Sequence, residues 1–215
     1  MVKLPDRLVI TSIPEGYNNY RGWNLHVRQY DGTWIERTTP FDSEARVRSR
    51  SFFSNRYRIY MEVEQLCFTD DLGQSWEYTT GGYNANHWHT MIVDTIFSSR
   101  EHGVYRYDPV IATWRFVIKV QNILASSGVT CERPLISYFC SVSNYLFVRI
   151  TNWSPNYSLG WFRSSDSGST WEQVNYGLED VISKDSYVHS HVTKDSLLIF
   201  GMRSGQALIT ADYGD

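Results

Sequence analysis

Three segments of the chain place basic side chains at alternate positions, a spacing that brings them to one face of a β-strand. The segments are Arg46-Val47-Arg48-Ser49-Arg50, Asn86-His87-Trp88-His89 and His189-Ser190-His191. If these faces look toward a common point, a basic site forms there from Arg48, Arg50, His87, His89, Arg133, His189 and His191. Arginine makes bidentate contacts with carboxylate, sulfate or phosphate, so the pattern predicts an anion-binding site. A solvated channel that binds nothing is the open alternative.

The two His-x-His pairs are also compatible with a metal ion, because imidazoles at alternate strand positions can share one. No carboxylate is obviously paired with them, and four histidines from two distant segments would have to meet within ligand distance. We therefore expect no metal ion and no cofactor.

Aromatic side chains in polar loops form a second set of candidates. Trp23, Tyr83, Trp153 and Tyr157 lie in or next to the Asn-, Gly-, Ser- and Pro-rich loops 14–23, 80–86 and 152–158. Such loops predict a contact surface for a glycan or a protein, since exposed Tyr and Trp are common in recognition surfaces. Core packing or loop anchoring is equally open for each of these side chains.

The segments that must position these groups have the pattern of strands. Apolar and polar residues alternate along the chain, and helical periodicity is almost absent. The predicted strands are 7–13, 24–30, 56–63, 89–93, 114–120, 145–151, 159–163, 196–201 and 207–210, with a short helical turn allowed at 177–183. No linker interrupts the pattern, which predicts one all-β domain over residues 1–215.

Composition narrows the function classes. The chain has 215 residues, 42% hydrophobic and 20% charged, with 8 Trp, 15 Tyr and 10 Phe. It lacks the apolar stretch of a membrane span or a signal peptide, so we expect a soluble cytoplasmic or virion protein without a membrane partner. A net charge of −3 disfavours nucleic acid, although Arg46, Arg48, Arg50, Arg56 and Arg58 alternate with aromatic residues in a way that keeps it as a third option. Three cysteines without CxxC spacing indicate neither a disulfide framework nor a zinc site.

A repeated motif, hydroxyl-x-Asp-x-Gly-x-x-Trp, punctuates the strands. It occurs at Thr69–Trp76 and Ser164–Trp171, begins again at Thr210–Asp215, and has weaker echoes around Asp31 and Asp108. In a hairpin loop, the hydroxyl and carboxylate accept backbone N–H groups, the glycine supplies a positive φ, and the tryptophan packs beneath the loop. The Asp positions 31, 71, 108, 166 and 212 lie 40, 37, 58 and 46 residues apart, close to the roughly 40–50 residues of a propeller blade.

This motif resembles the Asp box, or bacterial neuraminidase repeat, of sialidase-like β-propellers. The resemblance implies a single propeller of about five four-stranded blades, each box joining the third and fourth strands on the rim away from the ligand face. It gives a structural role to Thr69, Asp71, Gly73, Trp76, Ser164, Asp166, Gly168, Trp171, Thr210, Asp212 and Gly214. It also places the innermost strands near 46–52, 86–93, 134–140 and 187–193, so that the first set of basic residues would line the channel mouth.

The last blade would then lack its outer strand. Two closures are open: the N-terminal segment Val2–Leu4 adds to that blade, or a partner chain supplies the strand. An exposed edge would otherwise invite unwanted pairing.

The resulting hypothesis is a non-catalytic, lectin-like binding module for a glycan or an anionic ligand. The alternative is a structural or assembly subunit, such as a virion decoration or attachment protein, that binds other protein chains. A divergent sialidase-like glycosidase ranks below both, because Ser12-Ile13-Pro14 lacks the arginine and Tyr57-Arg58-Ile59-Tyr60 lacks the proline of the family's Arg-Ile-Pro signature. The same-face pair Glu62 and Glu64 has the spacing of inverting glycosidases but is more simply a solvated strand face.

Overall fold

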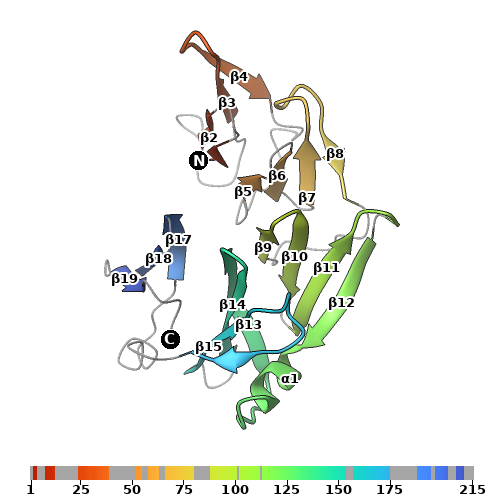
Figure 1. Cartoon of the computed structure of the whole chain (residues 1–215), viewed down its shortest axis with the longest axis vertical. Helices are drawn as coiled ribbons and strands as arrows, with labels where there is room; N and C mark the ends of the chain where they lie inside the picture. The colour runs from red at the N-terminus through yellow and green to blue at the C-terminus, as the bar shows by residue number, and fades with distance from the viewer. Residues whose placement is uncertain are drawn as a thin grey trace. The chain divides into compact units, whose positions relative to one another are not determined.

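The structure is a computed structural model. It describes residues 2–3, 8–12, 24–38, 52–54, 58–62, 66–79, 88–100, 102–111, 113–153, 157–174, 188–194, 197–202 and 207–210. The chain divides into two compact units, one of residues 1–87 with 108–114 and one of residues 88–107 with 115–215. The strands belong to antiparallel sheets in which neighbours in space are also neighbours in sequence (Figure 1).

The first unit contains two four-stranded sheets. One is formed by β1 (Val2–Lys3), β2 (Leu8–Ser12), β3 (Asn24–Arg28) and β4 (Trp34–Thr38). The other is formed by β5 (Phe52–Ser54), β6 (Ile59–Glu62), β7 (Leu66–Thr69) and β8 (Glu77–Tyr78). Side chains from both sheets bury one cluster, made of Leu25, Val27, Ile59, Met61 and Cys67.

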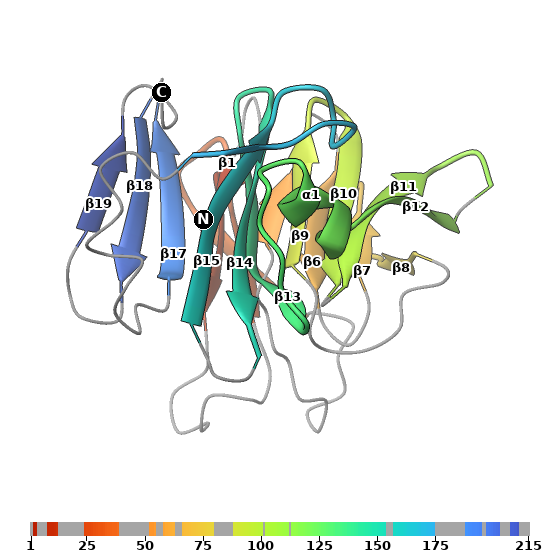
Figure 2. The ribbon, with the colours of Figure 1, turned by 90° about the horizontal axis from the view of Figure 1, so that it is seen from below.

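The second unit contains the remaining sheets. The first is formed by β9 (Trp88–Ile92), β10 (Thr95–Arg100), β11 (Gly103–Asp108) and β12 (Thr113–Lys119). Residues 108–114, which connect β11 to β12, are assigned to the first unit. The next is formed by β13 (Pro134–Val142), β14 (Tyr145–Asn152), β15 (Tyr157–Ser164) and β16 (Glu172–Gln173). The last contains β17 (Val188–Lys194), β18 (Leu197–Met202) and β19 (Ala207–Thr210), which lie side by side in Figure 2.

Strand β14 is covered on both faces. Leu146, Val148 and Ile150 belong to one buried cluster, while Phe147 belongs to another. A strand with two covered faces needs apolar residues at consecutive positions, which explains the run Tyr145-Leu146-Phe147-Val148 where simple alternation would place polar residues.

Each predicted strand overlaps a strand of the structure, but several strands, among them β4, β7, β10 and β11, were not predicted, and two further elements differ. A short helix, α1 (Val120–Ala125), follows β12, and its Val120, Ile123 and Leu124 enter the larger cluster with Phe97 and other residues. The sequence analysis missed this helix, because six residues give too little periodicity and its stability comes from packing. The helical turn allowed at 177–183 lies outside the described residues.

The N-terminal strand also differs from one predicted closure. Val2 pairs with Val9 and Lys3 pairs with Leu8, so β1 belongs to the first sheet and not to the last. Four residues separate the two strands, and this short connection favours pairing with β2. In the part of the chain that the structure describes, the last sheet has three strands.

Val93 provides a test of strain in one turn. It is 76% exposed and has φ +54° in the two-residue turn between β9 and β10. A β-branched residue is strained in this region, whereas asparagine tolerates it. We expect Val93→Asn to raise the free energy of unfolding by about 1 kcal/mol in chemical denaturation. Val110→Asn, at an exposed turn position without a positive φ, should give no gain, and equal gains would contradict the explanation.

Candidate functional site

The Asp positions of the motif share one place in the topology. Asp31, Asp71 and Asp166 each lie in the loop between the third and fourth strands of their own sheet, and Asp108 is the last residue of the third strand, next to that loop. Asp212 follows the third strand of the last sheet but lies outside the described residues, as does Gly214. The repeat found in the sequence therefore marks the same hairpin of successive sheets.

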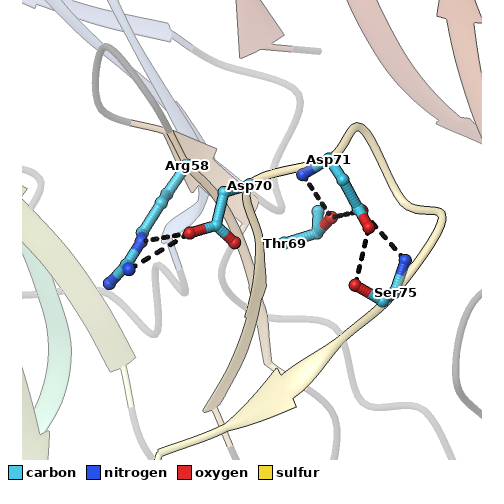
Figure 3. A network of polar contacts seen from close by, with 5 residues as sticks. All are labelled: Arg58, Thr69, Asp70, Asp71 and Ser75. Atoms are coloured by element: carbon cyan, nitrogen blue, oxygen red, sulfur yellow. Dashed lines mark hydrogen bonds and ion pairs between the residues drawn. The ribbon is translucent and has the colours of Figure 1, made fainter.

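The first full motif forms a local hydrogen-bonded cage around Asp71 (Figure 3). The Thr69 hydroxyl donates to Asp71 Oδ1 at 2.7 Å and accepts the Gly73 amide at 2.8 Å. The amides of Gln74 and Ser75 donate to Asp71 Oδ1 at 2.9 Å each, and the Ser75 hydroxyl donates to Oδ2 at 2.6 Å. Both carboxylate oxygens are thus occupied by donors of the hairpin itself.

The second full motif repeats this geometry in the other unit. The Ser164 hydroxyl donates to Asp166 Oδ1 at 2.9 Å and accepts the Gly168 amide at 2.8 Å. The amide and hydroxyl of Thr170 donate to the two carboxylate oxygens at 2.8 and 2.7 Å. Trp171 is 5% exposed and donates from Nε1 to the Gly168 carbonyl at 2.9 Å, beneath the loop.

The two echoes have a different geometry. Asp31 Oδ1 accepts the amide and the hydroxyl of Thr33, and Asp108 Oδ1 accepts the amide of Val110. These contacts reach two residues along the chain, as in Asx turns, whereas the full motifs reach four. The echoes keep the position of the motif but not its cage.

The cage predicts a pH dependence for the first motif. The Ser75 hydroxyl, followed by the Ser75 amide, lowers the pKa of Asp71 from 3.8 to about 2. Because the folded-state pKa is below that of the unfolded chain, this stabilisation is complete above pH ~4 and is lost as the pH falls toward ~2. We expect Asp71→Asn to flatten the acid side of the stability profile, measured by urea denaturation across this range. An unchanged acid slope would contradict the assignment.

A pocket of about 370 Å³ lies in the second unit and is the main candidate for a binding site. It is lined by His102, Gln121, Glu132, Arg133, Pro134, Leu135 and Trp153. Its volume falls within the roughly 300–1,000 Å³ of small-molecule sites. Arginine, glutamate, glutamine and histidine offer it donors and acceptors, and the indole of Trp153, 66% exposed, offers an aromatic face.

The pocket lies at the ends of the strands opposite the motif loops. In the sheet β13–β16, Asp166 lies in the β15–β16 loop, whereas Arg133 precedes β13 and Trp153 follows β14. In the sheet β9–β12, His102 lies in the β10–β11 turn, whereas Asp108 lies at the β11–β12 end. Successive turns of an antiparallel sheet alternate between its two ends, so the motifs leave the pocket end free.

The other predicted site residues are not gathered here. His89 is half-buried in β9, next to Trp88, whose ring lies 4.6 Å from that of Tyr138. Tyr157, 47% exposed, begins β15 opposite Asn152. His189 and His191 lie in β17, but only their backbone is described, as is also true of Thr210 in β19. Residues Trp23, Arg48, Arg50, Tyr83 and His87 lie outside the described residues.

One of the arginines considered for nucleic-acid binding, Arg58, contacts other side chains of its own sheet. The Arg58 guanidinium contacts Asp70 at 3.1 Å (Figure 3) and lies over the Phe68 ring, 4.3 Å from the centroid. It is engaged within its own sheet.

Sequence analysis missed His102, Gln121 and Glu132. The only available signal was that Glu132 precedes the predicted Arg133. Among the described residues, no group of three or more His, Cys, Asp or Glu side chains is placed to hold a metal ion. Over the same residues, no helix has the length and hydropathy to cross a membrane. The three cysteines carry free thiols.

Comparison with solved structures identifies the class of fold. The chain is similar to the extracellular domain of a putative hybrid two-component system from B. thetaiotaomicron, with 11% identity and a TM-score of 0.57 over 97% of this chain and 26% of that one. It is similar to puromycin hydrolase, with 9% identity and a TM-score of 0.55 over 93% of this chain and 32% of that one. The chain thus spans about a quarter to a third of these proteins.

These neighbours have propeller folds, and the all-β architecture of small antiparallel sheets is consistent with a β-propeller. No protein-family model and no curated protein matches the sequence.

Proposed function

We propose that the chain is a single β-propeller of about five blades with Asp-box hairpins, and that it acts as a non-catalytic binding module for a glycan or an anionic ligand. The observation that carries this proposal is the pocket that joins Arg133 and Trp153 at the strand ends opposite the motif loops. These two residues were singled out from the sequence for separate reasons, one as a basic group and one as an exposed aromatic group.

The lining favours binding over catalysis. Among the described residues that line the pocket, Glu132 is the single carboxylate, whereas glycosidases use a pair. The side chains of Glu62 and Glu64, the carboxylate pair considered in the sequence analysis, are not among those that the structure describes. An indole beside groups that donate and accept hydrogen bonds suits a sugar, whose ring has an apolar face and a rim of hydroxyls.

A glycan array with neutral, sialylated and sulfated ligands tests this function. We expect selective binding by the purified protein, with affinity reduced about tenfold or more in Trp153→Ala. Trp34→Ala removes an exposed indole from β4 in the first unit and should keep the binding. A folded protein that binds no glycan, or a Trp153→Ala variant that binds as well as the parent, would overturn the proposal.

The second candidate function is that of an assembly subunit that contacts other protein chains. It is favoured by the β11–β12 loop, where Val110 is 90% and Ile111 55% exposed. Adjacent apolar side chains at this exposure are more typical of an interaction site than of a solvated turn. A double variant, Val110→Ser with Ile111→Ser, would lose assembly with partner chains but keep glycan binding.

A further inference from the structure

We propose that the outer edge of β19 is a docking site for an extended segment of another protein chain, which pairs with it as an antiparallel fourth strand. The segment carries a tryptophan and, three positions later, a β-branched residue, separated by two solvent-facing residues. This inference goes beyond the proposed function and does not depend on the pocket. It rests on the two sheets that contain the full motifs, because each shows how such an edge is occupied.

The first argument is that β19 has the register of two third strands that already carry a fourth. Each of the three strands ends at the hydroxyl residue of a motif: β7 at Thr69, β15 at Ser164 and β19 at Thr210. In each sheet this hydroxyl residue pairs with the second strand. Strands β8 and β16 pair with the outer edges of β7 and β15, whereas β19 is the last described strand of its sheet (Figure 2).

The second argument is that both occupied edges use the same backbone contacts. The fourth strand begins eight residues after the hydroxyl residue, and its first two residues pair with the two residues that precede the hydroxyl residue. The next residue donates its amide across the edge. Thr79 donates to the Leu66 carbonyl and Val174 donates to the Trp161 carbonyl, at 2.9 Å each.

The edge of β19 has the equivalent backbone groups. Ala207 lies three residues before Thr210, as Leu66 lies three residues before Thr69. Because alternate residues of an antiparallel strand bond to the same neighbour, the backbone groups of Ala207 and Ile209 are the ones that a fourth strand would pair with. Such an edge is a template for pairing with another chain.

The N-terminal strand does not occupy this edge. It was the closure within the chain that the sequence allowed, but Val2 and Lys3 pair with β2 in the first sheet. Of the two closures predicted from the sequence, a strand supplied by a partner chain is therefore the one that the described sheets leave in place.

The third argument concerns the side chains that such an edge accepts. Trp171 belongs to a buried cluster and Trp76 packs against one. The residue three positions after each tryptophan is also buried, since Thr79 is 1% and Val174 6% exposed. Of the residues between these anchors, three are exposed and Gln173 is half-buried. Backbone bonds that give affinity, with alternate side chains that give specificity, are the usual mode of recognition by strand addition.

The test adds a synthetic peptide to the full 215-residue chain and follows the backbone amide signals by NMR. The peptide copies residues 169–176, Ser-Thr-Trp-Glu-Gln-Val-Asn-Tyr, which include the fourth strand of the second motif. We expect saturable shifts of the amide signals of β19. We also expect slower hydrogen exchange of the Ile209 amide, because pairing would give it an acceptor.

Modified peptides make the test specific. Alanine in place of the peptide's tryptophan removes an anchor, and N-methylation of its valine removes the amide that would donate to the Ala207 carbonyl. Each change should weaken binding about tenfold or more. N-methylation of the peptide's glutamine is the matched control, because the amide at this alternate position faces away from β19 and the affinity should stay nearly the same.

Three results would overturn the inference. The first is a peptide that leaves the β19 signals unchanged at millimolar concentration. The second is equal affinity for the two N-methylated peptides, which would show that binding does not use the ladder. The third is binding that is lost in Trp153→Ala, which would place the peptide in the pocket.

Discussion

Trp171→Ala is expected to lower the free energy of unfolding by about 3–5 kcal/mol, the usual cost of truncating a buried tryptophan. The indole is 5% exposed and belongs to the larger cluster together with Phe162 and Leu146. Its Nε1 donates to the Gly168 carbonyl, so the variant also removes a hydrogen bond that holds the loop of the second motif. Urea denaturation followed by far-ultraviolet circular dichroism measures the loss.

Trp76→Ala is the matched control, because Trp76 occupies the same place in the first motif. Its side chain is half-buried at the edge of the smaller cluster, and among the described residues its buried Nε1 has no hydrogen-bond partner. We expect it to lose roughly half as much stability as Trp171→Ala. Equal losses would mean that packing and the Gly168 contact do not determine the cost.

Gly73→Ala has the second largest expected effect, a loss of about 2–4 kcal/mol from backbone strain and overpacking together. Gly73 has φ +83°, and a Cβ there would lie 2.7 Å from Leu25 Cδ2 and 3.3 Å from Arg37 Cβ. Leu25 is fully buried, so it has little room to move. The new methyl group would push the motif loop away from the neighbouring sheet of the same unit.

Gly32→Ala separates strain from overpacking. Gly32 has φ +86° in the corresponding loop of the first sheet, but the nearest heavy atom to its added Cβ is 3.9 Å away. Strain alone should lower its free energy of unfolding by about 1–2 kcal/mol. A loss at Gly73 no greater than the loss at Gly32, both measured by chemical denaturation, would rule out the contact with Leu25 as a cause.

Features fixed by nearby residues could be predicted from the sequence. Strand β19 begins and ends at the predicted residues, and the motif loops lie between third and fourth strands, because alternation and turn chemistry act over a few residues. Helix α1 was not predicted from the sequence because it depends on the packing of Ile123 and Leu124 in a cluster shared with distant strands. Likewise, the sequence identified the segment around Asp31 as a weaker echo of the motif, but whether its carboxylate bonds two or four residues ahead depends on loop length.

The pocket shows where prediction from sequence ends. Arg133 and Trp153 each had a recognisable type and setting, but their meeting depends on the register of β13 against β14. That register includes a shift between Ile136 and Tyr138, and a shift of one residue changes which side chains share a face. Gln121 and His102 reach the same pocket through a helix and a turn whose positions are set by tertiary packing.

The hydrogen bonds of the two motif loops also have a consequence for the order of folding. No bond within either cage spans more than four residues, as the contacts of Asp71 and Asp166 show. Closing so short a segment costs little chain entropy, and hairpins form within about 1–10 μs. We therefore expect β7 to pair with β8, and β15 to pair with β16, before the long-range contacts of their sheets form. Each cage would then act as a nucleus that sets the alignment of its outer strands early.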